Sequence, residues 1–252
     1  MERADRSAVA TFFFADQALE PHAQLLLGEA VARHLRVRRL GTGTLVALVD
    51  GAGQRATGMV VRDARDAVTV EVETVEGVLP LPPVHLMLPV ADRDRMLWLA
   101  EKCAELGITT WRPVMWKRSR SVSPRGEGPM FAARVRARMV AALEQSGGAH
   151  LPQIFPEATP QRAIAAVPAG GTRLVLDHSA SPVFSIALSA PVTLALGPEG
   201  GLESDELDAL TEAGFVPASI GPGILRFETA GAAGAAIARA ALHAHVGALH
   251  VQ

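Results

Sequence analysis

The chain has 252 residues, of which 49% are hydrophobic and 20% charged, and its formal net charge is −2. This length provides a buried core for one or two domains, and the composition is typical of a soluble globular protein. The single cysteine, Cys103, excludes an intrachain disulfide and a cysteine-based zinc cluster. The first ten residues lack the apolar core of a signal peptide, so we expect a cytoplasmic protein with no membrane segment.

The charge is distributed unevenly along the chain. Residues 112–138 hold eight basic side chains against Glu127 alone, whereas residues 197–252 hold two arginines against seven acidic side chains. A basic run is often only a solvated face. A segment of net charge +7 in a mildly acidic protein also favours contact with a polyanion such as a nucleic acid, and both interpretations stay open.

Residues 1–76 are predicted to be mostly β-structure. The segments 44–50 and 67–75 are strand-like, and valines alternate along the second. Between them, GAGQRA at 51–56 matches the loose dinucleotide pattern G-x-G-x-x-A. A true fingerprint opens a helix, however, and here a glycine and β-branched residues follow. The sequence therefore predicts a hairpin turn rather than a nucleotide site.

Arginines cluster in the segment RHLRVRRLG at 33–41. They stand among Leu35 and Val37, so one interpretation is a helix or strand with an ordinary polar face. Because arginine pairs bidentately with phosphate, the same segment also predicts a phosphate-contacting patch. The members of this patch are Arg33, Arg36, Arg38 and Arg39.

Residues 77–83 hold three prolines and are the best candidate for a linker. Beyond them, strand-like and helical segments alternate. Strands are predicted at 84–90, 109–116 and 173–177, and helices at 92–106 and 131–145. This alternation indicates an α/β domain with a parallel sheet and covering helices.

Two glycine-bearing turns, 197–201 and 221–223, each follow a short strand and lead towards a helix. The strands are predicted at 193–196 and 216–220. Such turns would lie side by side at the carboxyl edge of a parallel sheet, where open α/β folds bind ligands. The structural alternative for the first turn is a tight connection with a well-charged first helical turn.

The charge around the first turn narrows the choice of ligand. Glycines let a ligand approach the backbone, and a glycine turn before a helix commonly binds phosphate. Here carboxylates crowd the helix start and would repel a phosphate; they belong to Glu199, Glu203, Asp205 and Glu206. Since no lysine or arginine lies within the turn, the sequence favours a neutral or cationic ligand.

The last predicted helix, 228–246, is rich in alanine and contains Gly231 and Gly234. Glycine costs helix stability, so these two positions predict close backbone packing. His243 and His245 are two residues apart and face different directions on a helix, which makes them a poor metal pair.

Several motifs together resemble the ribosomal RNA small subunit methyltransferase E family of the SPOUT superfamily. GPEGG at 197–201, followed by L-x-x-x-E-L, and ILR-x-ETA at 224–230 carry the resemblance in the C-terminal half. HLRVRR at 34–39 and the segments EKCAELGI, WKRSRSV and LEQSGGAHLPQI add to it. Gly148 and Gly223 stand where that family usually has arginine.

The resemblance implies a small PUA-like β-barrel over residues 1–76, a linker at 77–83 and a SPOUT methyltransferase domain over 84–252 with a C-terminal trefoil knot. It also implies S-adenosylmethionine as the cofactor, with no metal, and methylation of N3 of a uridine in small-subunit (16S) ribosomal RNA. The expected partner is that RNA or the 30S subunit. A homodimer is expected because SPOUT proteins pair through helices of this domain.

By the same resemblance, backbone loops at the knot would bind the cofactor: 196–201 and 220–230, with 176–178 as a third wall. The residues expected in that pocket are Leu176, Leu196, Gly197, Pro198, Glu199, Gly200, Gly201, Ile220, Gly221, Ile224, Leu225, Arg226, Thr229 and Ala230. Those expected to contact RNA are Arg33, Arg36, Arg38, Arg39, Lys117, Arg118 and Arg120.

Three residues are candidates for the chemistry. Arg226 is expected to orient the target nucleotide or its phosphate. Glu228 and Glu199 are each expected either to act as a base or only to orient loops, and the sequence does not separate these roles. Asp177 and His178, at the end of a strand, are further candidates.

Two other functions are compatible with these residues. A related SPOUT enzyme would methylate a ribose 2′-hydroxyl or a transfer-RNA base, although the paired HLRVRR and EQS segments favour uridine N3. A non-catalytic RNA-binding module is the second alternative, and the glycines in place of arginines at 148 and 223 point towards it.

Overall fold

The computed structural model describes residues 10–121 and 124–249. The first nine residues, on which the expected cytoplasmic location largely rests, lie outside it. The chain separates into two compact units. One comprises Met1–Pro80 with Leu143–Leu151, and the other comprises Leu81–Ala142 with Pro152–Gln252. No helix in the described part of the chain combines the length and the apolar character that a membrane crossing requires.

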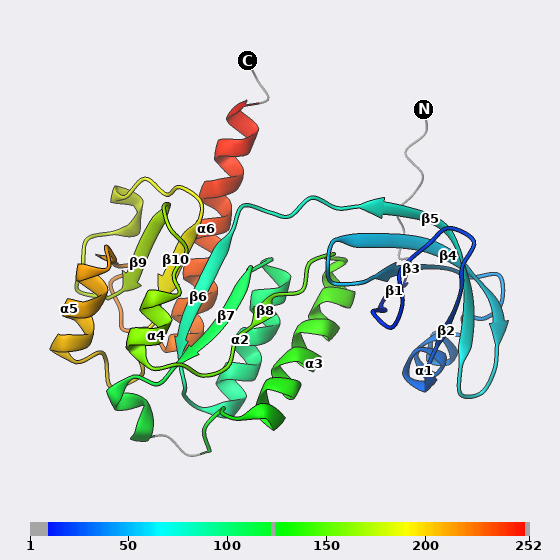
Figure 1. Ribbon diagram of the computed structural model, residues 1–252, viewed down its shortest axis with the longest axis horizontal. Coiled ribbons are helices and arrows are strands. Elements are labelled where there is room, and N and C mark those ends of the chain that lie inside the picture. The colour runs from blue at the N-terminus through cyan, green and yellow to red at the C-terminus, as the bar shows by residue number, and fades with distance from the viewer. Residues whose placement is uncertain (1–9, 122–123, 250–252) are drawn as a thin grey trace. The chain divides into compact units, whose positions relative to one another are not determined.

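The first unit is a five-stranded sheet with one helix (Figure 1). The strand order is β1-β3-β4-β5-β2, in which β1 and β3 are parallel and the other neighbours antiparallel. The elements are β1 (Ala10–Phe13), β2 (Gln24–Leu27), α1 (Glu29–Val37), β3 (Leu45–Val49), β4 (Gln54–Asp63) and β5 (Val68–Gly77). The alternating valines of β5 are buried, which confirms the predicted strand with one face towards the core.

The GAGQRA segment forms the hairpin turn between β3 and β4, as predicted. Val49 pairs with Arg55 across the antiparallel ladder. In the turn, Asp50 Oδ1 accepts hydrogen bonds from the N–H groups of Ala52 and Gln54 at 2.7 and 2.9 Å. A nucleotide fingerprint needs a helix at this point, and a strand follows instead.

The segment Leu143–Leu151, which carries the EQS motif, groups with the first unit. Glu144 Oε1 accepts a hydrogen bond from the Phe13 N–H of β1 at 2.8 Å. The Arg55 guanidinium donates to the Gly147 carbonyl, and the His150 ring nitrogen Nε2 lies 2.8 Å from the Val78 carbonyl. A segment well beyond the linker in sequence is therefore hydrogen-bonded to the N-terminal sheet and its hairpin turn.

The second unit has a six-stranded, wholly parallel sheet in the order β11-β9-β10-β6-β7-β8, which confirms the predicted α/β class. Its strands are β6 (Val84–Pro89), β7 (Thr110–Val114), β8 (Gln153–Ile154), β9 (Thr172–Leu176), β10 (Val192–Ala195) and β11 (Val216–Ala218). Its helices are α2 (Arg93–Glu105), α3 (Pro129–Ser146), α4 (Pro160–Ala165), α5 (Ser204–Glu212) and α6 (Phe227–Leu249), with short 3-10 turns at Lys117–Ser121 and Val183–Ser185.

Helices cover both faces of this sheet (Figure 1). On one face α6 packs against α2, β6 and β10, and on the other α4 and α5 bury a cluster that includes Met87 and Phe215. A Cβ atom at Gly231 would lie 2.9 Å from Leu196 Cδ1, and one at Gly234 would lie 2.9 Å from Leu176 Cδ1. The two glycines thus allow α6 to approach the strand ends closely, as predicted.

Candidate functional site

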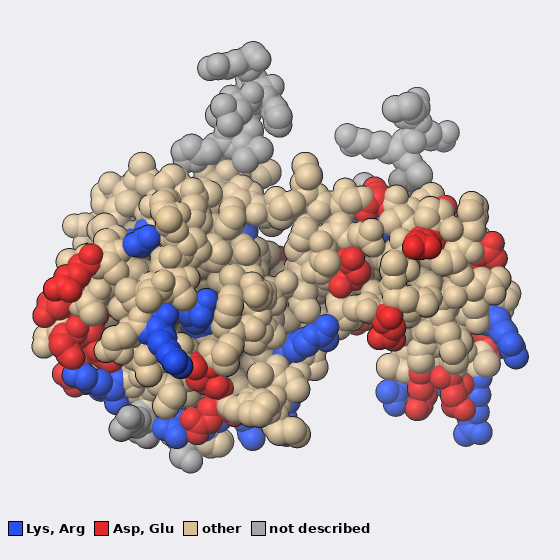
Figure 2. Space-filling view, viewed as in Figure 1, with Lys and Arg blue, Asp and Glu red and all other residues tan. Residues whose placement is uncertain are grey.

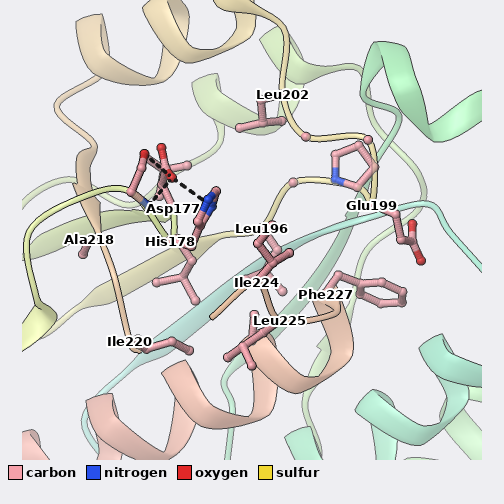
Figure 3. Close-up of a pocket in the computed structure, with 18 of the residues that line it drawn as sticks. Asp177, His178, Leu196, Glu199, Leu202, Ala218, Ile220, Ile224, Leu225 and Phe227 are labelled. Atoms are coloured by element: carbon pink, nitrogen blue, oxygen red, sulfur yellow. Dashed lines mark hydrogen bonds and ion pairs between the residues drawn. The ribbon is translucent and has the colours of Figure 1, made fainter. Parts of the chain in front are cut away.

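A cavity of about 490 Å³ opens at the carboxyl edge of the parallel sheet (Figure 3). Leu176, Leu196 and Ala218, which end or follow β9, β10 and β11, contribute to its wall. The two glycine-bearing turns of the sequence line it from β10 and β11, and the start of α6 closes it. This is the strand-end position at which open α/β sheets hold ligands.

Most of the residues expected in a cofactor pocket line this cavity. Of the fourteen, only Arg226 and Thr229 do not. The lining also includes residues beyond these fourteen: Val175, Asp177, His178, Ser179, Leu202, Leu207, Ala218, Gly223 and Phe227. Of these, Asp177 and His178 belong to the third wall expected at 176–178, and Gly223 and Phe227 to the expected loop 220–230.

Backbone groups around the cavity are free to bind a ligand. In the described part of the chain, the amide N–H groups of Ile220, Gly221, Ile224 and Leu225 donate no hydrogen bond within the protein. The side chains of Ile224 and Leu225 are 82% and 41% exposed. Large apolar side chains beside unpaired amides form a surface that a ligand with an apolar ring and a polar edge can cover.

The first glycine turn is held by the segment that follows β7. Trp116 is fully buried, and its Nε1 donates a 2.9 Å hydrogen bond to the Leu196 carbonyl at the end of β10. The Arg118 guanidinium donates to the Gly200 carbonyl and pairs with Glu203 at 2.8 Å from Nε to Oε1. The turn is therefore fixed at both of its ends.

The negative charge at the start of α5 is partly compensated by this same segment, which weakens the repulsion expected from the sequence. Lys117 Nζ lies 2.6 Å from Asp205 Oδ2, and the Lys117 N–H donates to Glu206 Oε1 at 2.8 Å. Figure 2 shows basic side chains beside the acidic ones over α5. Each charge of the Lys117–Asp205 pair stabilises the other, so the pKa of Lys117 is raised and that of Asp205 lowered. Carboxylates paired in this way repel a phosphate far less than free ones.

Arg95 of α2 joins the two glutamates that were candidates for the chemistry. Its Nη1 lies 3.0 Å from Glu199 Oε1, and its Nε lies 3.9 Å from Glu228 Oε1. Glu199 lines the cavity, whereas Glu228 lies in the first turn of α6 and is only 9% exposed. The Glu228 Oε2 atom is buried and has no hydrogen-bond partner among the described residues. One oxygen of this buried carboxylate is therefore left without a donor among the described residues.

Asp177 and His178 lie on the opposite side of the cavity from Glu199 (Figure 3). Asp177 Oδ1 accepts hydrogen bonds from the Ser179 N–H at 2.9 Å and the Ser179 hydroxyl at 2.8 Å. These bonds lower the pKa of Asp177, and the adjacent His178 adds to the effect. The cavity therefore has a carboxylate on each of two sides.

Arg226 is exposed at the residue immediately before α6. Its carbonyl accepts the Ala230 N–H at 2.9 Å. Within the described residues its guanidinium has no hydrogen-bond or ion-pair partner. The Arg226 guanidinium, just before the first residue of α6, can therefore contact a substrate outside the cavity.

The residues expected to contact RNA differ in their surroundings. Arg33, Arg36, Arg38 and Arg39 are all exposed on α1 or just after it. Lys117 and Arg118 take part in the ion pairs at α5 described above. The side chain of Arg120 lies outside the described residues. Lys117 and Arg118 are exposed as well, so the described residues of the two basic segments differ in their ion pairs rather than in their exposure.

Sequence reasoning missed Arg95 and Trp116 as site residues. Arg95 was missed because it occupies what reads as an ordinary polar position of an amphipathic helix. Its partner Glu199 also lies 104 residues away in the sequence. Trp116 was placed at the end of the predicted strand 109–116, and no hydrogen-bond partner was predicted for it. One local signal was present. Arg95 is the third residue of α2, which begins soon after the end of β6, and this position places its charge at the edge of the sheet.

Comparison with known proteins agrees with this geometry. A model of the RNA methyltransferase domain matches residues 79–239. The ribosomal RNA small subunit methyltransferase E of Mycobacterium bovis is 31% identical over 236 residues, which cover 89% of each chain. The Bacillus subtilis protein of that name is 25% identical over 220 residues, covering 81% of this chain and 85% of its own.

A solved structure gives the same result. The crystal structure of the Neisseria gonorrhoeae ribosomal RNA small subunit methyltransferase E bound to S-adenosyl methionine is 26% identical, with a TM-score of 0.82 over 92% of this chain and 98% of that one. Fold and matched residues define an RNA methyltransferase domain. Over nearly its whole length, the chain belongs to the ribosomal RNA small subunit methyltransferase E family.

Proposed function

We propose that the chain methylates N3 of a uridine in small-subunit (16S) ribosomal RNA, with S-adenosylmethionine as the methyl donor. Membership of the family supports methyl transfer to ribosomal RNA. The relative from Neisseria gonorrhoeae, which has the same fold, binds S-adenosyl methionine. The observation on this chain that carries the proposal is the cavity lined by both glycine-bearing turns at the sheet edge.

The residues of the cavity fit this cofactor. Its volume of about 490 Å³ lies within the usual range for small-molecule sites. Leu196, Ile224 and Leu225 offer apolar surface to an adenine ring, and the unpaired amides of the second turn can bind the polar edge of that ring. The carboxylates of Glu199 and Asp177 suit a ligand that carries a positive sulfonium.

When bound, the cofactor supplies an electrophilic methyl group. The protein must then orient the uridine, accept the proton from N3 and exclude water. We assign the orientation of the nucleotide or its phosphate to Arg226, because its guanidinium is exposed and unpaired within the described residues. Arginine provides the planar donors that suit a phosphate or a base edge.

Glu199 and Glu228 each satisfy one requirement for the proton acceptor. Glu199 lines the cavity, but one of its oxygens is bound by Arg95. Glu228 keeps Oε2 unpaired, but it does not line the cavity. We propose that one of them accepts the proton and that the other, through Arg95, fixes the turn.

The finer architecture is part of the same proposal. Family membership supports a PUA-like barrel in the first unit, a trefoil knot around the cavity, a homodimer and a cytoplasmic location. Sedimentation equilibrium of the full chain tests the dimer directly.

Calorimetric titration with S-adenosylmethionine is the first test. We expect binding near one site per chain, abolished in Gly200→Val, because a Cβ there would lie 3.1 Å from Arg118 Cδ and disturb the side chain that holds the turn. Gly28→Val is the matched control, since nothing lies within 4 Å of a Cβ at that position.

Methyl transfer is then measured on naked 16S RNA and on 30S subunits, with mass analysis of the modified nucleoside. N3-methyluridine supports the proposal. A 2′-O-methylated ribose or a modified transfer RNA would instead assign the chain to another SPOUT activity. If no cofactor bound even with RNA present, a non-catalytic RNA-binding module would be the better interpretation.

A further inference from the structure

A row of polar side chains crosses the parallel sheet at the end opposite the cofactor cavity. The register pairs Gln153 with Thr110, Thr110 with His85, and His85 with Thr193, across β8, β7, β6 and β10. Partners in a parallel ladder point to the same face, so the four side chains share one face. Each is the first or second residue of its strand, whereas the cofactor cavity lies beyond the last residues.

These four residues line a second cavity, of about 220 Å³. Arg112 and Phe155 also line it, and Met87 and Val167 are among its apolar walls. No aspartate or glutamate lines this cavity, in contrast to the first. Among the described residues of its wall, Arg112 is therefore the only one with a permanent charge, and that charge is positive.

Arg112 has no counter-ion among the residues that the structure describes. Its guanidinium carbon lies 3.8 Å from the centre of the Phe155 ring, and within the described residues the side chain makes no hydrogen bond or ion pair. Arg173, on the same face of the neighbouring β9, donates to the carbonyls of Ala213 and Pro168 at 2.5 and 3.0 Å. Half-buried N–H donors without acceptors are costly, so Arg112 has unused capacity for an anion.

The polar row provides further hydrogen-bonding groups. His85 Nδ1 lies 2.9 Å from Thr110 Oγ1, which leaves Nε2 free. Thr193 is 2% exposed, and its hydroxyl has no hydrogen-bond partner among the described residues. Burial and the charge of Arg112 lower the pKa of His85, which favours its neutral ring beside the guanidinium.

We propose that this second cavity binds a phosphate-type oxyanion, with Arg112 supplying the charge and Thr193, His85 and Gln153 supplying hydrogen bonds. Stacking on Phe155 holds the guanidinium flat and leaves its N–H edge available, which is the geometry that suits a bidentate oxyanion. The oxyanion comes either from a free phosphate compound or from a phosphodiester of RNA. The site is separate from the cofactor cavity and does not depend on the function proposed above.

Thermal unfolding of the full chain in potassium phosphate and in potassium chloride, at equal ionic strength, tests the site. A ligand that binds only the folded state raises Tm by mass action. Phosphate also raises the Tm of folded proteins in general, because it is excluded from their surface. In the wild-type chain we expect a rise in Tm that is larger than this general effect. In Arg112→Gln only the general effect should remain, because phosphate binding weakens by about tenfold or more when its charged partner is removed.

Two further variants complete the test. Thr193→Val keeps the side-chain volume and should reduce the specific rise. Arg162→Gln is the matched control: Arg162 is exposed on the neighbouring α4 and does not line the cavity, so the rise should be unchanged. Equal phosphate-dependent rises in the wild type, Arg112→Gln and Thr193→Val would overturn the proposal. An unaltered affinity of Arg112→Gln for S-adenosylmethionine would show that this site acts apart from the cofactor cavity.

The source of the oxyanion is distinguished with a uridine oligonucleotide that has no terminal phosphate. If the oligonucleotide removes the specific phosphate effect, and Arg112→Gln weakens its binding, the site holds an RNA phosphodiester. If the oligonucleotide has no such effect, the site holds a free phosphate compound. Both outcomes support an oxyanion site.

Discussion

Arg95 Nη1 and Glu199 Oε1 lie 3.0 Å apart and join α2 to the first glycine turn. The same guanidinium reaches Glu228 in the first turn of α6, with 3.9 Å between Nε and Oε1. One side chain therefore tethers two segments that close the cofactor cavity. The position of both candidate proton acceptors depends on it.

Substitution of Arg95 by glutamine should loosen the first glycine turn. Because the side chains of Arg95 and Glu199 are each 34% exposed, solvent screens their attraction, and we expect the Kd for S-adenosylmethionine to rise only about two- to fivefold. Calorimetric titration measures this change. Lys102→Gln, on the same helix but paired with Glu101 and Glu105, is the control and should bind normally. Identical affinities in both variants would remove Arg95 from the site.

Replacing Arg226 by alanine should abolish turnover and leave the fold and the cofactor affinity intact. The reason is that its side chain is exposed, unpaired within the described residues and absent from the wall of the cavity. Methyl incorporation into ribosomal RNA, measured beside circular dichroism and calorimetry, separates these effects. Normal turnover in the variant would exclude Arg226 from the mechanism.

Trp116→Phe should destabilise the chain by about 1–3 kcal/mol, because the buried Leu196 carbonyl loses its hydrogen-bond donor while most of the ring volume remains. Denaturant unfolding measures this destabilisation, and binding of S-adenosylmethionine should weaken as well because Leu196 lines the cavity. Trp98→Phe is the matched control, since Trp98 is 45% exposed. Equal stabilities of the two variants would contradict the role given to the Trp116 bond.

Asp177 should titrate at an unusually low pH, since hydrogen bonds from Ser179 lower its pKa. A carboxyl whose pKa is lower in the folded state contributes stability above its unfolded pKa, and this contribution disappears as the pH falls through the folded pKa, below about pH 4. Ser179→Ala removes the hydroxyl bond and should move the pKa of Asp177 up towards its ordinary value. Carboxyl carbon NMR of both proteins checks the shift, and an unchanged titration would show that the hydroxyl is unimportant.

Neutralising Arg36, Arg38 and Arg39 with glutamine should weaken RNA binding and reduce its salt dependence. Removal of one phosphate-binding charge at a duplex-like site lowers the slope of log K against log salt by about 0.9. Filter binding at several salt concentrations measures the slope. The double change of Arg62 and Arg65, exposed elsewhere in the same unit, removes two positive charges and controls for most of the change in net charge. An unchanged slope would move the RNA surface to the segment 117–138.

Local pattern was sufficient for the longer helices of the second unit, for two strands of the first unit, for most strands of the parallel sheet and for the position of the cavity. Alternating valines predicted β5, and glycine turns after apolar runs predicted the sheet edge that carries the cavity. Short elements were not predicted. β8 has two residues and α4 has six, which are too few to show the hydrophobic period of a strand or a helix. Where α1 lies, the arginines and apolar residues were compatible with either a helix or a strand.

The electrostatics of the site could not be predicted in the same way. The sequence around the first glycine turn has only carboxylates, and their cationic partners, Lys117 and Arg95, lie 88 and 104 residues away from the acids they bind. Such pairs are created by the order of strands in the sheet. The charge of an isolated segment is therefore a poor guide to the field at a site that several segments build.

The grouping of Leu143–Leu151 with the N-terminal unit limits how the protein can be divided. A fragment that ended at Pro80 would expose the Phe13 N–H without Glu144 and the Arg55 guanidinium without the Gly147 carbonyl. The hairpin turn would also lose the carbonyl of Ala149, which accepts the Gly53 N–H at 2.9 Å. An N-terminal fragment that folds by itself must therefore carry residues 143–151, supplied as a covalent graft or as a separate peptide.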